Sequence, residues 1–310
     1  GAYEMAHSQV LTKRESAASN LFDWFIYILF GIDALLCIYP FWYMLIYSIS
    51  DPIKVSAGVY LLPRGFSLFN LQKVFELKGI GSAVLISALR TVVGTGLTVF
   101  ACSFLGYLFT KREMPGRSFL YRMLIITMYV GGGLIPTYLI YKSYGLTNNF
   151  WVYVLPSMVS AYNVILIKTY IEQIPASLEE SAMIDGAGYF RVYISIIFPL
   201  SLPIVATISV FAAVGQWNSW FDNHIYNAGT ESLTTLQYLL YNFLNESERL
   251  AQILRDSGNI SDAQAAASRQ LTPKGVRMTI TLIVTIPIFL VYPYMQKYFI
   301  KGIMIGAVKG

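Results

Sequence analysis

The chain has 310 residues, of which 55% are hydrophobic and only 13% are charged. Soluble domains carry roughly 25% charged residues, so this composition excludes an ordinary soluble protein and indicates an integral membrane protein. The formal net charge is +5, but the basic residues are scattered over loops and tails and form no stripe of the kind that binds nucleic acid. Anionic lipid headgroups explain them better.

Six apolar runs are each long enough to cross roughly 30 Å of hydrocarbon. The first is too long for the core of a signal peptide, so we expect an uncleaved membrane anchor. The sequence therefore predicts an all-α integral membrane protein with six transmembrane helices and with both termini on one side. The predicted spans are 24–50, 82–109, 119–142, 150–171, 200–221 and 277–299.

The short link between the second and third spans decides the predicted orientation. Short loops rich in Lys and Arg face the cytoplasm, whereas long loops cross the membrane largely regardless of charge. The link between the third and fourth spans offers little beyond Lys142. We therefore expect cytoplasmic tails at 1–23 and 300–310, a six-span membrane domain at 24–299 and a large extracytoplasmic loop at 222–276. The basic residues of the deciding link are Lys111, Arg112, Arg117 and Arg122.

Residues 175–199 interrupt the apolar pattern with carboxylates, glycines and an arginine. Ser177 lies three residues before Glu180, which is the spacing of a capping box. The run 185–188 predicts a turn, and a second helix is expected from about Tyr189 to Phe198. The segment is thus predicted to form a helix-turn-helix at the cytoplasmic surface. Its small residues and carboxylates suit docking to another protein, and they equally suit a plain re-entry loop.

A second group of residues, in or beside the spans, is typical of a solute pathway. The tryptophans and amides combine flat apolar faces with hydrogen-bonding groups, as sugars require, although Trp is also common at the membrane interface. The isolated amide of the fourth span suits either a solute or a neighbouring helix. The glycines and proline of the third span predict a broken or closely packed helix. The candidates are Gly132, Gly133, Pro136, Asn163, Gln216, Trp217, Asn218 and Trp220.

Two charged residues, Asp33 and Arg90, lie inside predicted spans. An ionisable group in hydrocarbon is costly and therefore suggests a function. For Arg90, which lies near an outer end, we expect snorkelling to the interface instead. Asp33 is consistent with pairing to another span, with the inner interface or with gating.

The sequence lacks the motifs of the main enzyme classes that act at membranes. It contains no Gly-x-x-x-x-Gly-Lys-Ser/Thr phosphate loop and no His-Glu-x-x-His motif. We therefore expect no catalytic residue, no metal site and no cofactor bound by this chain. A stand-alone secondary carrier is an alternative, although such carriers usually show intramembrane carboxylates or paired half-repeats.

The segment 175–199 resembles the cytoplasmic signature of the permease subunits of binding-protein-dependent ABC importers, in the subgroup for oligosaccharides and related sugars. Ser181 stands where that signature has an Ala. Within the subgroup, the likeness is nearest to permeases for aldouronates or complex polysaccharides. The stretches that carry the resemblance are 180–182, 185–187 and 196–200, together with 132–138, 216–221 and 296–310.

The resemblance implies a non-catalytic subunit of an ATP-driven importer in a bacterial cytoplasmic membrane. Such a subunit forms half of the pathway for an oligosaccharide, or alternatively for a non-sugar solute. The implied partners are a cytoplasmic ABC ATPase dimer that binds ATP and Mg, a second permease subunit and an extracytoplasmic solute-binding protein. For the two permeases, a heterodimer is favoured over a homodimer. The residues that would couple this chain to the ATPase are Glu179, Glu180, Ser181, Ala182, Asp185, Gly186 and Ala187.

Overall fold

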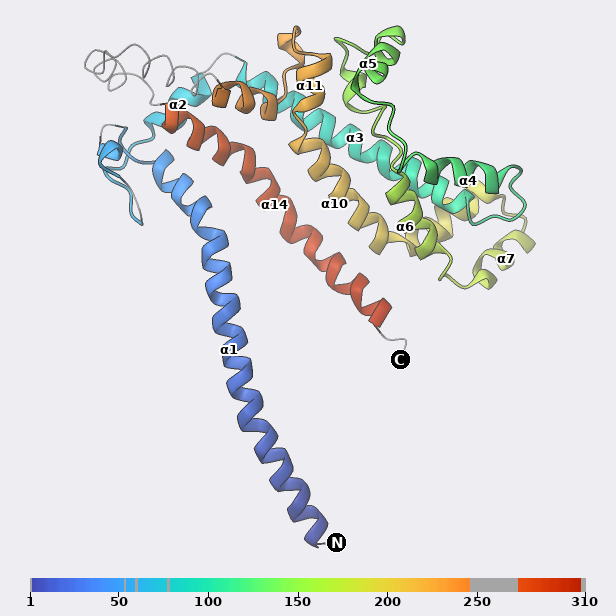
Figure 1. Ribbon diagram of the computed structural model, residues 1–310. Coiled ribbons are helices and arrows are strands. Elements are labelled where there is room, and N and C mark those ends of the chain that lie inside the picture. Colours follow the sequence, from blue (N-terminus) through green and yellow to red (C-terminus); the bar gives the residue numbers. More distant parts are fainter. Residues whose placement is uncertain (1, 53, 59–60, 77–78, 246–272, 308–310) are drawn as a thin grey trace. The chain divides into compact units, whose positions relative to one another are not determined.

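The computed structural model describes residues 2–52, 54–58, 61–76, 79–245 and 273–307 (Figure 1). The elements of these residues are helices, with one isolated antiparallel bridge between Ser50 and Phe66. The chain divides into two units: residues 1–72 with 264–282, and residues 73–263 with 283–310.

The first unit contains one long helix, α1 (Ala2–Ser48), followed by the short helix η1 (Lys54–Ala57). The part of α1 from Phe22 to Ser48 is long and apolar enough to cross a membrane, which agrees with the first predicted span. The helix also includes most of the predicted tail 1–23, so tail and span are continuous. Asp33 lies on an exposed stretch of this helix.

The second unit is built around α3 (Ile80–Leu108), which packs against α10 (Leu202–Asn218) and α6 (Ala161–Ile171) (Figure 1). The core between them consists of buried aliphatic and aromatic side chains, among them Cys102, Tyr107, Val164, Ile167 and Ile208. These helices correspond to the second, fourth and fifth predicted spans.

Two glycines of α3 permit this close packing. A β-carbon on Gly106 would lie 2.8 Å from Cγ2 of Ile167 and 3.2 Å from the backbone nitrogen of Lys168. A β-carbon on Gly94 would lie 2.7 Å from Cδ of Gln216. Small residues serve the same purpose in membrane helices generally, because they let backbones approach.

The third predicted span, 119–142, is not one continuous helix. It consists of α4 (Arg117–Ile126) and α5 (Leu134–Ser143), separated by residues 127–133. Gly133 has φ +78°, a conformation that favours glycine, so the break predicted from the glycines is confirmed. The fourth predicted span is also divided, into η2 (Phe150–Tyr153) and α6.

The predicted helix-turn-helix is confirmed, with two differences. Helix α7 (Ala176–Ile184) is followed by a turn in which Gly186 has φ +84°. The capping box is wrong, because Pro175 occupies the N-cap and Ser177 lies inside the helix. The second helix consists of three consecutive elements: α8 (Tyr189–Val192), the π-helix η3 (Tyr193–Ile197) and α9 (Phe198–Leu200).

The chain then bends by 83° at Ser201 into α10. Beyond α10, the predicted extracytoplasmic loop contains α11 (Phe221–Tyr226), η4 (Glu231–Leu233) and a helix over residues 236–245. Residues 246–272 of this loop lie outside the described residues. The last helix, α14 (Pro273–Ala307), extends beyond the predicted sixth span at both ends, and residues 300–307 are part of it rather than a separate tail.

The described residues do not reproduce six continuous membrane-length helices. Three helical stretches within them are long and apolar enough to cross a membrane: Phe22–Ser48, Ile80–Leu108 and Lys274–Pro293. The bent pair Tyr189–Leu200 and Leu202–Asn218 adds a fourth if it is taken together. The membrane class of the protein is therefore supported, while the number of spans stays a prediction.

We expect Gly106→Ala to lower the free energy of unfolding by about 2 kcal/mol, because the added methyl group overpacks the contact with α6. Gly96→Ala is the matched control on the same helix, since no atom lies within 4 Å of its added β-carbon. The measurement is the thermal unfolding midpoint of the purified protein in detergent. Equal midpoints for the two variants would contradict the packing argument.

Candidate functional site

Residues 175–199, called here the coupling segment after the role that the sequence predicts for them, present an exposed tip. Glu180, Asp185 and Gly186 are exposed, and the side chain of Ile184 has 86% of its surface accessible. Apart from its two chain neighbours, no residue places an atom within 4 Å of the position that a β-carbon of Gly186 would occupy. The tip therefore combines an apolar side chain with flanking carboxylates, which is a chemistry suited to a partner surface that carries Arg or Lys.

Not all the predicted coupling residues lie on that tip. Ser181 is exposed, and its hydroxyl donates to the carbonyl oxygen of Ser177 at 2.8 Å. Ala182 and Ala187 are half-buried and pack against the core that α3 and α6 form. These small residues hold the segment close to the helices behind it.

Glu179 points in the opposite direction from the tip. Its carboxylate accepts a hydrogen bond of 2.9 Å from the hydroxyl of Tyr107 and forms an ion pair with Lys111. The side chains of Lys111 and Glu179 are only 14% and 15% exposed. The Lys111 amine also lies 4.4 Å from the centroid of the Tyr107 ring. Glu179 therefore binds Tyr107 at the end of α3 and Lys111 in the link that follows this helix, and it does not face the outer surface.

The second half of the coupling segment is also attached to α3. The hydroxyl of Tyr193, in the π-helix η3, lies 2.6 Å from the hydroxyl of Ser103. Its ring packs against those of Phe104 and Tyr107, with centroids 5.2 and 5.6 Å away. The coupling segment thus has one exposed face and one face that is fixed to α3.

A cavity of about 490 Å³ lies between α3, α6 and α10, within the range of small-molecule sites. It is called here the polar cavity after its polar lining residues, but Phe211, Ala212 and Gly215 make part of its wall apolar. Two of the predicted solute residues, Asn163 and Gln216, line it. The remaining lining residues include hydroxyls and aromatic rings: Thr98, Tyr153, Ser157, Ser160 and Tyr162.

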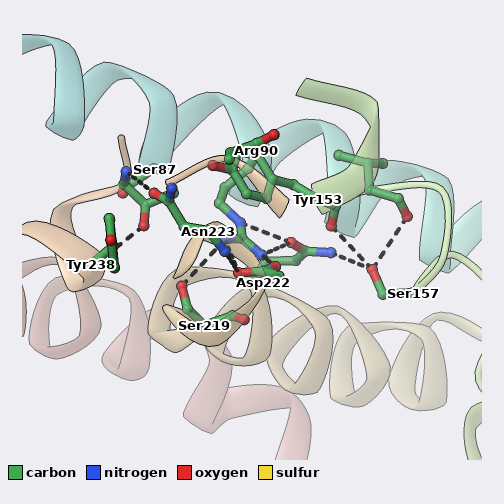
Figure 2. Close-up of polar contacts among 12 residues, drawn as sticks. Ser87, Arg90, Tyr153, Ser157, Ser219, Asp222, Asn223 and Tyr238 are labelled. Atoms are coloured by element: carbon green, nitrogen blue, oxygen red, sulfur yellow. Dashed lines mark hydrogen bonds and ion pairs between the residues drawn. The ribbon is translucent and has the colours of Figure 1, made fainter. Parts of the chain in front are cut away.

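Arg90 closes one wall of this cavity and is only 2% exposed. Its guanidinium donates to both carboxylate oxygens of Asp222, at 2.5 and 3.1 Å, and to the carbonyl oxygen of Ser219 at 3.2 Å (Figure 2). It also lies 4.5 Å from the centroid of the Tyr153 ring. The predicted snorkelling of Arg90 is therefore wrong, because its charge has a partner within the protein.

Gln216 joins the arginine to the next part of the cavity wall. Its Oε1 accepts hydrogen bonds from Arg90 at 3.1 and 3.2 Å, and its Nε2 donates to the Ser157 hydroxyl at 2.8 Å. These bonds fix the amide orientation. Gly94 is required behind it, since a side chain there would displace Gln216.

The chain that follows Asp222 is fixed by further buried polar contacts, one to α3 and one within the loop itself. The Ser87 hydroxyl accepts a hydrogen bond of 2.8 Å from the backbone N–H of Leu236 (Figure 2). Asn223 accepts one of 2.7 Å from the N–H of Thr235 through its side-chain oxygen. The loop is therefore held in place over the Arg90 side of the cavity.

The other predicted solute residues do not gather at the cavity. The indole of Trp217 donates to the carbonyl oxygen of Val284 at 2.9 Å, and Asn218 accepts from Gln237 at 3.0 Å. The ring of Trp220 stacks on that of Tyr241 with centroids 4.0 Å apart. The three residues of the third span lie outside the cavity lining, at the break before α5: Gly132, Gly133 and Pro136.

Sequence reasoning missed most of the cavity residues. The charge of Arg90 inside a predicted span is the one local signal of a functional residue here. Asp222 falls in the predicted loop 222–276, so the sequence does not indicate that it pairs with Arg90. Tyr153, Ser157 and Tyr162 carry no local pattern that distinguishes them from ordinary residues of a span. Only the packing of helices from distant parts of the sequence brings them together.

We expect Asp222→Asn to destabilise the protein by about 3 kcal/mol, because it leaves the Arg90 charge buried without its counter-ion. Glu76→Gln removes an acid from the exposed Lys73–Glu76 pair, whose side chains are 42% and 62% exposed, and should change stability by less than about 1 kcal/mol. Thermal unfolding in detergent compares the two. Equal small effects would show that the Arg90 ion pair contributes no more than a surface pair.

Comparison with known proteins places this architecture among transport proteins. No protein-family model matches the chain. It is 35% identical over 294 residues to the polygalacturonan/rhamnogalacturonan transport system permease protein YtcP of Bacillus subtilis, covering 94% of this chain and 99% of that one. It is 33% identical over 311 residues to protein LplC of the same organism, covering 98% of this chain and 100% of that one.

A solved structure agrees with the sequence comparison. The fold matches a chain of a bacterial ABC transporter involved in the import of the acidic polysaccharide alginate, with a TM-score of 0.78 and 27% identity, over 91% of this chain and 98% of that chain. The chain therefore belongs to the family of ABC importer permeases that these sugar and polysaccharide transport proteins represent.

Proposed function

We propose that this chain forms half of the membrane pathway for an oligosaccharide and that its coupling segment transmits the work of a separate ATPase dimer. The single observation that carries the coupling role is the exposed tip of Glu180, Ile184, Asp185 and Gly186 on a segment whose opposite face is fixed to α3. A rigid segment with one free face can transmit a displacement, whereas a loose loop cannot.

The orientation and the partners follow from the same proposal. The contact between Lys111 and Glu179 supports a common side for the basic link and the coupling segment, and the positive-inside rule favours the cytoplasm for that link. Both termini are then cytoplasmic.

We propose two further protein partners besides the ATPase. One is a second permease in a heterodimer, because one subunit of this size rarely encloses a pathway alone, and the other is an extracytoplasmic solute-binding protein. ATP and Mg belong to the ATPase.

The polar cavity is the proposed solute contact of this subunit. Among the described residues that line it, Arg90 and Asp222 carry charges, and these neutralise each other. The wall therefore offers a neutral set of hydroxyls, amides and aromatic rings, the groups that bind sugar hydroxyls and the apolar faces of sugar rings. The names of the relatives, which mention polygalacturonan, rhamnogalacturonan and alginate, support fragments of such a polysaccharide as the solute class.

Family membership also separates the proposal from its rivals. A stand-alone carrier would need no ATPase, whereas the relatives are permeases of transport systems. A permease for a non-sugar solute is less well supported, because the relatives named for a solute include polygalacturonan and arabinooligosaccharide systems.

A pull-down from the native membrane tests the coupling role. The tagged wild type should bring down an ATPase and a second permease, whereas Glu180→Arg should lose at least 90% of the ATPase and retain the permease, because the reversed charge opposes a basic partner surface. Glu231→Arg, an exposed acid in the predicted extracytoplasmic loop, is the matched control and should retain both. Undiminished ATPase binding by Glu180→Arg would disprove docking at this tip.

Uptake kinetics test the cavity. Asn163 is 7% exposed and lines the cavity, and within the described part of the chain its side-chain amide has no protein partner. We expect Asn163→Leu to raise the KM for a labelled galacturonan oligosaccharide about tenfold, because one hydrogen bond to the solute is lost. Asn218→Leu makes the same chemical change outside the cavity and should leave KM within about twofold. Equal KM values for both variants would remove Asn163 from the pathway.

A further inference from the structure

We infer that Glu179 does not dock the ATPase but joins the coupling segment to α3, which then carries its movement to the polar cavity. The inference rests on the proposed function of the coupling segment. Its structural basis is a cluster of three side chains, Tyr107, Lys111 and Glu179, called here the Glu179 joint. Glu179 is a positioning residue in this view, because it acts through α3 and touches neither solute nor nucleotide.

Neighbouring carboxylates of α7 have different surroundings. Successive side chains of a helix point about 100° apart, so Glu179 and Glu180 cannot serve the same surface. Glu180 is exposed at the tip, whereas Glu179 is 15% exposed and has both a hydroxyl and an ammonium partner. A carboxylate that is already occupied in this way has little capacity left for a second protein.

The joint is strong enough to transmit a displacement. A hydrogen bond or ion pair between charged groups is shorter and stronger than one between neutral groups, and partial burial reduces its screening by water. Removal of one partner would leave the other charge half-buried without a counter-ion, which is unfavourable. The end of α3 and the start of the coupling segment should therefore move together.

α3 connects this joint directly to the cavity. Tyr107 and Arg90 lie on the same continuous helix, about 26 Å apart along its axis at 1.5 Å per residue. Arg90 binds Gln216 at the end of α10 and Asp222 at the start of α11. A shift of α3 would consequently displace Gln216 and Asp222, which form part of the cavity wall.

The other route from the coupling segment to the cavity is less direct. It runs through the π-helix η3, across the 83° bend at Ser201 and then along α10. π-Helical turns and sharp bends interrupt the regular hydrogen bonding of a helix, so this route is expected to absorb part of a displacement. α3 is the straight connection, and the Ser103–Tyr193 contact attaches the π-helix to it as well.

The test uses the assembled importer with its ATPase and second permease. Glu179→Gln keeps the size of the side chain and removes its charge, and Glu172→Gln, which removes an acid from the more exposed Lys168–Glu172 pair, is the matched control and should leave uptake within about twofold. We expect Glu179→Gln to retain the ATPase and its basal ATP hydrolysis within about twofold, while uptake of a labelled galacturonan oligosaccharide falls at least tenfold. The reversed pair, Lys111→Glu with Glu179→Lys, should restore uptake to within about threefold of the wild type.

Three results would overturn the inference. Loss of the ATPase from Glu179→Gln would make Glu179 a docking residue, and wild-type uptake by that variant would make the joint dispensable. Failure of the reversed pair to restore uptake, with the second permease still bound, would show that the ion pair is not what matters. A wild-type complex without any ATPase would instead refute the proposed function, so the two failures are distinguishable.

Discussion

A guanidinium inside a membrane protein must have its charge paired, and the second unit of this structure depends on how that requirement is met for Arg90. Its partners come from the end of α10 and the start of α11, so the ion pair with Asp222 fixes where three helices meet. The cost of an unpaired charge in this position is far larger than that of a missing apolar contact. The pair therefore holds the loop after α10 against α3 and neutralises one wall of the cavity.

The same helix, α3, also contributes to the second polar cluster on which the proposed function rests. Towards one end of the helix, Arg90 pairs with Asp222. At the other end, Tyr107 and the nearby Lys111 bind Glu179 of the coupling segment. Between them, Gly94 and Gly106 let α10 and α6 approach so closely that no β-carbon fits. Tight packing along its length and ion pairs towards both ends make α3 a rigid connection, as the proposed coupling between a partner ATPase and the cavity requires.

The neutral character of the cavity has a consequence for recognition. Because Arg90 is occupied by Asp222, this wall would contact a polysaccharide fragment through hydroxyls, amides and aromatic rings rather than through charge. Such contacts are weak one by one and tolerate related sugars. This fits the proposal that a separate solute-binding protein delivers the solute to this subunit.

The sequence by itself determined the membrane class, the helix-turn-helix of the coupling segment and the break before Pro136, because apolar run length and the backbone needs of glycine are local properties. It also identified the family, through short motifs that can each be read within one contiguous stretch of the chain. Tertiary structure alone decided that Glu179 faces inward while Glu180 faces outward, that Arg90 is paired rather than snorkelling, and that Asn163 and Gln216 share a cavity from which Trp217 is excluded. The physical reason is that burial and pairing depend on contacts between residues far apart in sequence, and a local sequence pattern does not determine which of these residues come into contact.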